Sequence, residues 1–83
     1  LINRVVAASD LDAEVQRFAD RILARSGAAI AIGKRTFYAQ NELGLSGALD
    51  VAGRAMISNL NLEDATEGIE AFLAKRPPQW RNS

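Results

Sequence analysis

The sequence contains neither cysteine nor histidine, and these two absences exclude several kinds of chemistry. Without thiols the chain forms no disulfide and offers no cysteine nucleophile, and without imidazole it lacks the commonest general base. Zinc sites built from cysteine and histidine are excluded for the same reason. The serines have no histidine to activate them, and the glycines show no phosphate-binding spacing. We therefore predict no metal site, no cofactor and no complete catalytic site within this chain.

The chain also lacks an excess of charge and any long apolar run. Ten basic and ten acidic residues cancel to a formal net charge of zero, whereas nucleic-acid binding usually requires a basic surplus. No apolar run approaches the roughly 20 residues of a membrane-spanning helix, and no signal peptide is visible. We expect no nucleic-acid partner, no membrane partner and, from the missing cysteines, a cytoplasmic location.

Eighty-three residues form at most one small domain, and a chain of this size buries only about 60% of its unfolded surface. The sequence starts with leucine rather than methionine. Its first stretch, Leu1–Val6, is rich in β-branched residues and resembles a strand, but no second strand-like run follows to pair with it. Both observations predict a fragment of a longer protein.

Four amphipathic helices are predicted after this leading segment. In the first helix Leu11, Val15, Phe18 and Ile22 recur with helical spacing on one face. Similar reasoning predicts helices over about residues 10–25, 28–41, 46–60 and 62–76. The expected fold class is therefore all-α, with an extended segment over residues 1–8 and one helical domain over residues 9–83. The short connections favour packed, antiparallel neighbours.

Small polar residues before each helix predict its cap. Their side-chain oxygens can accept the free amides of a first turn. The expected caps are Ser9, Asp10, Ser26, Ser46 and Asn61. Gly33 interrupts the second helix, and we expect a close helix contact there, because glycine costs about 1 kcal/mol relative to alanine in a helix interior.

The last helix carries charge signals at both ends. Glu63 and Asp64 suit its positive N-terminal end, and Lys75–Arg76 suit its negative C-terminal end. We expect the acidic residues of this helix, including Glu67 and Glu70, to lie on its solvated side. Pro77–Pro78 then end the helix, and Trp80 requires a surface on which to pack.

The Lys75–Arg76 pair permits two interpretations. The simpler one is that both side chains complement the helix dipole and remain solvated. In the alternative, Lys75 or Arg76 binds a phosphate, and Phe72, one turn earlier on nearly the same face, stacks on a nucleotide base. The sequence pattern leaves both open.

Four segments, in order, resemble the C-terminal part of the crotonase superfamily, the enoyl-CoA hydratases and isomerases. They are the leading L-I-N-R-V-V, the helix over 12–25, the A-I-A-I-G-K-R-T-F-Y run at 29–38, and the E-D-A-T-E-G-I-E-A-F-L-A-K-R-P-P-Q-W ending. Gly27 departs from the family's usual proline, and Leu62 from its usual serine or threonine cap. The first departure affects a turn and the second moves the expected cap to Asn61.

The resemblance implies a helical region that makes homo-oligomer contacts, in trimers or hexamers, and helps cover an acyl-CoA site. It implies CoA-binding roles for Phe72 and Lys75, and a weaker role for Met56 at the acyl-CoA pocket. The parent reaction would be hydration of a 2-enoyl-CoA, or a related conversion in another branch. The family's oxyanion hole and catalytic glutamates lie upstream of this region, so we expect the chain alone to be inactive.

Two other classes remain as alternatives. One is a stand-alone helical domain that associates with itself through the apolar surface around Leu49, Met56 and Trp80, without catalysis. The other is a helical DNA-binding module, which the zero net charge and the absence of a basic stripe disfavour.

Overall fold

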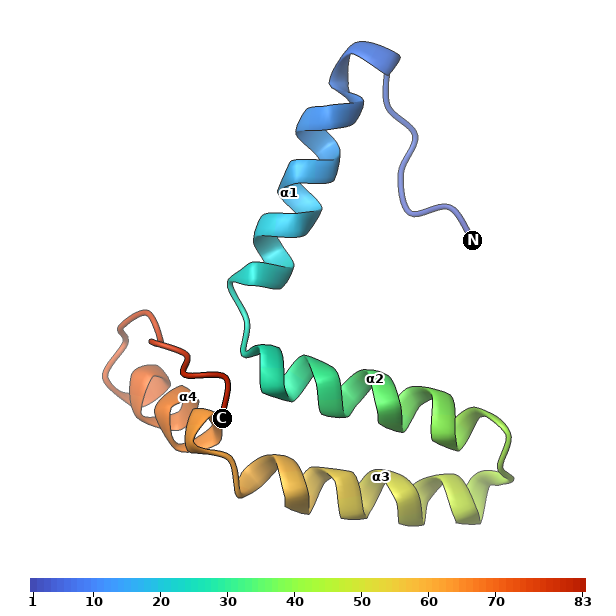
Figure 1. Cartoon of the computed structure of the whole chain (residues 1–83), viewed down its shortest axis with the longest axis vertical. Coiled ribbons are helices and arrows are strands. Elements are labelled where there is room, and N and C mark those ends of the chain that lie inside the picture. Colours follow the sequence, from blue (N-terminus) through green and yellow to red (C-terminus); the bar gives the residue numbers. More distant parts are fainter.

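The computed structural model describes all residues 1–83 and contains only helices. A 3-10 turn, η1 (Ala8–Asp10), precedes four α-helices: α1 (Leu11–Leu23), α2 (Gly27–Asn41), α3 (Leu45–Leu60) and α4 (Glu63–Leu73) (Figure 1). The all-α fold with four helices is confirmed. Residues 1–7 form no strand, because the chain has no second strand to pair with their backbone groups. The division between residues 1–8 and 9–83 stays a prediction.

The helices form an open, angular arrangement. Helices α2 and α3 run antiparallel as a hairpin, α4 lies near the end where α2 begins and α3 ends, and α1 projects away from this group (Figure 1). The radius of gyration is 16.2 Å, whereas a compact domain of this length has about 12 Å. None of the four helices combines the length and the apolar composition that a bilayer crossing requires.

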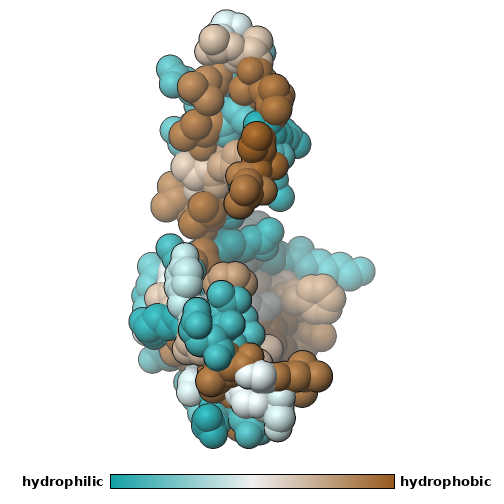
Figure 2. All heavy atoms as spheres, turned by 90° about the vertical axis from the view of Figure 1, so that its right-hand side faces the viewer, coloured by the Kyte–Doolittle hydropathy of each residue, from teal (hydrophilic) through white to brown (hydrophobic).

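The chain has almost no hydrophobic core of its own. Four residues are buried, and Ala71 is the only apolar one among them. Large apolar side chains are exposed on every helix, and Figure 2 shows them gathered along α1. They include Val15, Ile22, Leu23, Leu49, Met56, Ile57, Ile69 and Phe72. Exposed apolar faces of this extent are typical of surfaces that another structure covers.

An ion-pair cluster attaches the leading segment to α1. Glu14 is buried, although it is charged, and its carboxylate accepts hydrogen bonds from Arg4, at 2.7 Å, and from Arg17. Two guanidinium groups thereby compensate one buried charge, as a buried carboxylate requires. The segment is thus held by a polar contact rather than by strand pairing.

Only one of the predicted serine caps is present. The Ser26 hydroxyl accepts the Ala29 amide at 3.2 Å and caps α2. Asp10 occupies the N-cap position of α1 without a side-chain cap bond, and Ser9 lies inside the 3-10 turn. The prediction for those two residues is wrong because the 3-10 turn already satisfies the first amides, with the Asp10 amide donating to the Ala7 carbonyl at 2.9 Å.

The predicted caps of the last two helices are also wrong. Helix α3 begins at Leu45 after Gly44, so Ser46 lies within its first turn. Asn61 ends α3 instead of starting α4, whose N-cap is Leu62 with no side-chain cap bond. The C-terminal segment supplies the missing acceptor, since the Asp64 amide donates to the Ser83 backbone oxygen at 2.9 Å.

Asp64 is the centre of a network that joins α2, α4 and residues 77–83, which we call the C-terminal strap. Its carboxylate accepts hydrogen bonds from the Ser26 hydroxyl (2.5 Å), the Arg81 amide (2.7 Å) and the Asn82 amide (3.0 Å). Asp64 is only 3% exposed, so the prediction that this carboxylate is solvated is wrong. The Ser26 hydrogen bond, followed by those from the strap, lowers the pKa of Asp64, against an opposing effect of burial.

The strap also holds the junction between α1 and α2. The Trp80 indole donates to the Ala24 carbonyl at 2.8 Å, and the Gly27 amide donates to the Asn82 side chain at 2.7 Å. The indole ring lies against Gly68 of α4, where the absent side chain leaves room for it. Trp80 is therefore a packing anchor, as the sequence predicts, and the strap links the junction of α1 and α2 to α4.

The contact between Trp80 and Gly68 predicts opposite effects for two glycine substitutions. A Cβ at Gly68 would lie 3.2 Å from the indole ring, so Gly68→Ala should displace Trp80 and lower the free energy of unfolding. Gly53 has no atom within 4 Å of such a Cβ, so Gly53→Ala should stabilise α3 by about 0.5–1 kcal/mol. Urea unfolding of both variants measures the difference, and an equal gain from Gly68→Ala would contradict the contact.

The pKa of Asp64 predicts acid release of the strap. Because this pKa lies below the ordinary 3.8, the stabilisation is present at neutral pH and is lost as the pH falls through the lowered value. We expect the indole N–H signal of Trp80, the only tryptophan in the chain, to shift in that acid range. The Asp64→Asn variant should be less stable at neutral pH and should lack this part of the transition. An unchanged acid transition would contradict the assignment to Asp64.

Candidate functional site

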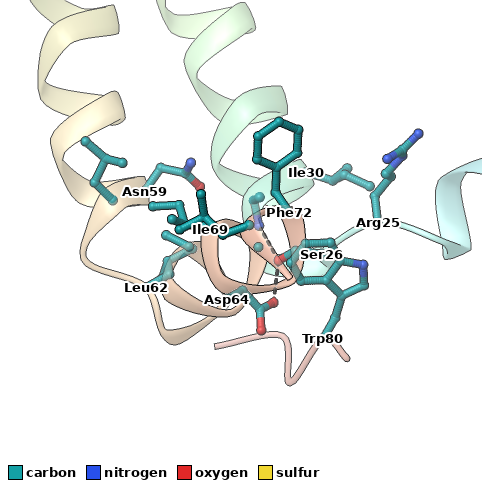
Figure 3. Close-up of a pocket in the computed structure, with 14 residues that line it drawn as sticks. Arg25, Ser26, Ile30, Asn59, Leu62, Asp64, Ile69, Phe72 and Trp80 are labelled. Atoms are coloured by element: carbon teal, nitrogen blue, oxygen red, sulfur yellow. Dashed lines mark hydrogen bonds between the residues drawn. The ribbon is translucent and has the colours of Figure 1, made fainter. Parts of the chain in front are cut away.

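A groove of about 570 Å³ lies between α2, the end of α3, and α4 (Figure 3). Its walls are mostly apolar, with Ile30, Leu62, Ile69 and Phe72 among them. Ser26, Asp64 and Trp80 of the network described above also line it, so the strap contributes to its wall. An apolar cavity with a few fixed polar groups is the usual form of a small-molecule site.

A second hollow of about 340 Å³ adjoins the groove between α2 and α3. Ala29 and Asn59 line both spaces, so the two hollows are neighbours, and we call them together the apolar trough. The Asn59 side-chain oxygen is buried at this point and has no hydrogen-bond partner. A bound molecule with a donor at the middle of the trough would satisfy this oxygen.

The three predicted binding residues occupy different parts of this surface. Phe72 lines the groove and is 82% exposed, Met56 lines the second hollow, and Lys75 lines neither. Phe72 and Lys75 are nevertheless close in the backbone, because the Lys75 amide donates to the Phe72 carbonyl at 3.2 Å. The CoA-binding roles of Phe72, Met56 and Lys75 stay predictions.

Lys75 has an unusual backbone conformation. Its φ is 51°, in the left-handed region that glycine normally occupies just after a helix. The Arg76 amide donates to the Ala71 carbonyl at 3.0 Å, which completes a Schellman closure of α4. A lysine at this position costs stability relative to glycine, and such strain is often found at functional residues.

Arg76 and Glu67 form a two-pronged ion pair along α4. Nη1 and Nη2 of Arg76 lie 2.6 Å and 3.0 Å from the two carboxylate oxygens, and the Gln79 amide donates to the same carboxylate at 2.7 Å. The Arg76 hydrogen bonds, and then that from Gln79, lower the pKa of Glu67 to about 2. The same contact raises the pKa of Arg76.

This ion pair distinguishes the two cations that the sequence leaves open. The guanidinium of Arg76 already has a carboxylate partner, whereas Lys75 makes no ion pair. Of the pair, Lys75 is therefore the cation available to an anionic ligand. The expectation that Glu67 is merely solvated is wrong, since its carboxylate holds both the turn after α4 and the strap.

Sequence reasoning missed the structural roles of Asp64 and Glu67 and the buried oxygen of Asn59. Ser26, the side-chain partner of Asp64, lies 38 residues away in the sequence, and the strap amides lie 17 and 18 residues away. No helical spacing reveals such contacts. The sequence pattern predicts one solvated set for the acidic residues of α4, and only their hydrogen-bond partners distinguish them. The close-approach prediction for Gly33 is wrong as well, because nothing lies within 4 Å of its Cβ position.

The chain resembles known proteins over nearly its whole length. It is 46% identical over 80 residues to the "Enoyl-CoA hydratase domain-containing protein 3, mitochondrial" of Rattus norvegicus, covering 96% of this chain. It superposes on a crystal structure of an enoyl-CoA hydratase from Mycobacterium smegmatis with a TM-score of 0.92 and 43% identity over 95% of its length. The structure of human enoyl Coenzyme A hydratase domain-containing protein 3 gives a TM-score of 0.91 and 40% identity over 95%.

These relatives are much longer than this chain. It spans 27% of the rat protein and 31% of each of the two solved chains. No family model matches it. The sequence identity and the close superposition nevertheless agree with each other and with the four segments of the sequence pattern. In sequence and fold, the chain therefore corresponds to the C-terminal helical region of the crotonase superfamily, the family of the enoyl-CoA hydratases and isomerases.

Proposed function

We propose that this region joins subunits of an enoyl-CoA hydratase-like enzyme and covers part of an acyl-CoA site. The observation that carries the proposal is the nearly coreless fold, in which Ala71 is the only buried apolar residue. Apolar surface that a chain leaves exposed to this extent is stable in water only when another surface covers it. A homo-oligomer, a trimer or hexamer, supplies such a cover.

The second part of the proposal concerns Phe72 and Lys75. An exposed aromatic ring and an unpaired ammonium group, joined by the closure of α4, suit a ligand with an aromatic base and phosphates. Coenzyme A has both. Met56, in the adjoining hollow, would contact the acyl part through its flexible apolar side chain.

The parent reaction in this proposal is addition of water to a 2-enoyl-CoA thioester. Asp64 and Glu67 are poorly suited to be its acid–base groups, because both accept structural hydrogen bonds that lower their pKa values. The catalytic groups would come from other parts of the protein, and this region alone would be inactive. The cytoplasmic location expected from the sequence stays a prediction, since the rat relative is described as mitochondrial.

The backbone of Lys75 provides a test in which stability and binding change in opposite directions. Lys75→Gly relieves the left-handed strain, which should raise the free energy of unfolding by about 1 kcal/mol. The same change removes the ammonium group and should weaken CoA binding, measured by titration calorimetry. Lys34→Ala, which removes the only other lysine, is the matched control and should leave CoA affinity unchanged. Undiminished CoA affinity of Lys75→Gly would contradict the binding role.

Phe72 provides a test of both halves of the proposal. Phe72→Ala in the complete protein should raise the KM for acyl-CoA or shift the sedimentation profile toward smaller species, because it removes a large exposed ring from the groove. Tyr38→Ala, an exposed aromatic residue outside both hollows, is the control. If Phe72→Ala changes neither the kinetics nor the sedimentation, the assignment of Phe72 fails.

The alternative function is a stand-alone helical domain that associates with itself without catalysis. The exposed apolar face of α1 favours association in either case. The two functions differ in their response to CoA. Concentration-dependent assembly that CoA does not affect would support the alternative.

A further inference from the structure

Two interactions with Glu67 hold the turn that contains Lys75, the residue proposed to contact a phosphate. Arg76, next to Lys75, places both guanidinium prongs on the Glu67 carboxylate, and the Gln79 amide donates to it from the strap. The backbone between these two anchors contains Pro77 and Pro78. The turn that includes Lys75 is thus tied at its C-terminal side to the helix that precedes it.

Such a tie is needed because the conformation of Lys75 is unfavourable for a residue with a side chain. At φ 51° the backbone is in a region that costs about 1–2 kcal/mol for ordinary residues. Two backbone hydrogen bonds close the turn, from Lys75 to Phe72 and from Arg76 to Ala71. Without a further anchor, Lys75 would return part of the time to other conformations and its ammonium group would move away from a fixed location.

We infer that Glu67 is a positioning residue for CoA binding, which holds Lys75 in its left-handed turn through the two-pronged contact with Arg76. The inference rests on the proposed function, in which Lys75 meets a phosphate of CoA. Glu67 itself touches no ligand in this proposal. Its role is to keep Arg76 in an ion pair with the Glu67 carboxylate, so that the neighbouring Lys75 stays unpaired and in a fixed position.

Long-range charge and the positioning of Lys75 predict opposite changes in CoA affinity when the Glu67 carboxylate is removed. CoA is an anion, so replacing a nearby carboxylate with a neutral amide should strengthen its binding through long-range electrostatics. Positioning predicts weaker binding instead, since the turn that carries Lys75 loses its anchor. The sign of the change therefore separates the two effects.

Glu70 provides the matched control for this comparison. It lies on the same helix three residues after Glu67 and lines, together with Glu67, a small polar surface hollow. Its side chain makes no hydrogen bond or ion pair. Glu70→Gln changes the net charge by the same amount as Glu67→Gln but leaves the contact with Arg76 intact. Arg76→Lys is the second test variant, because it retains the charge and removes the two-pronged geometry.

The experiment is a titration of the complete protein with CoA, followed by steady-state kinetics with 2-butenoyl-CoA. Glu67→Gln and Arg76→Lys should each weaken CoA binding by about twofold to fivefold, a range that a surface ion pair can supply. Both variants should raise KM with little change in kcat. Glu70→Gln should bind CoA as well as the parent protein or better. Circular dichroism of each variant checks that the helices remain.

The decisive comparison uses a Lys75→Ala background. If Glu67 acts through Lys75, Glu67→Gln should cause no further loss of CoA affinity once Lys75 is absent. An equal loss in both backgrounds, or stronger binding by Glu67→Gln alone, would overturn the inference. If Lys75→Ala weakens CoA binding but Glu67→Gln and Arg76→Lys do not, the positioning role fails and the proposed function stands. If Lys75→Ala has no effect on CoA binding, both fail.

Discussion

The arrangement of this chain depends on one buried carboxylate. Asp64, in the first turn of α4, receives a hydroxyl from the start of α2 and two backbone amides from the C-terminal strap. Three donors offset the cost of burying its charge, and the positive end of α4 favours the same charge. No comparable set of apolar contacts joins α2 directly to α4. The relation between α2, α4 and the strap is thus fixed by directional hydrogen bonds, which define a geometry more narrowly than apolar packing does.

This construction explains how the molecule can be both defined in shape and open. A polar network of a few residues joins α2 to α4 and the strap, which leaves the apolar faces of these helices free for the trough and for contacts with other surfaces. A compact four-helix bundle would bury those same faces between its own helices. The chain instead has the organisation of a piece whose core is completed from outside, in keeping with its 27% share of the length of its rat relative.

The sequence predicts the helices well because their apolar spacing is a local property. The periodic face of α1, for example, is read within a few residues. The predicted end of the last helix at the proline pair is wrong, because α4 already ends at Leu73, where the left-handed turn at Lys75 closes it. Caps are predicted poorly, since Ser46 and Asn61 compete with neighbouring starts that are equally acceptable to the backbone. The family resemblance implies binding roles for Phe72, Lys75 and Met56, which stay predictions, whereas the structural roles of Asp64 and Glu67 arise from tertiary contacts across long sequence separations. Local patterns contain no record of those contacts.

The position of the strap has a consequence for how the protein is made. Residues 77–83 leave the ribosome after all four helices, yet Trp80 and Asn82 hold the junction between the first two of them. These contacts between the strap and the junction of α1 and α2 therefore cannot form before residues 77–83 have been made, even if each helix forms as soon as it emerges. During that interval the apolar face of α1 is exposed and is not held by the strap. The contacts that orient α1 relative to α2 thus form only after α4 and the strap have both been synthesised.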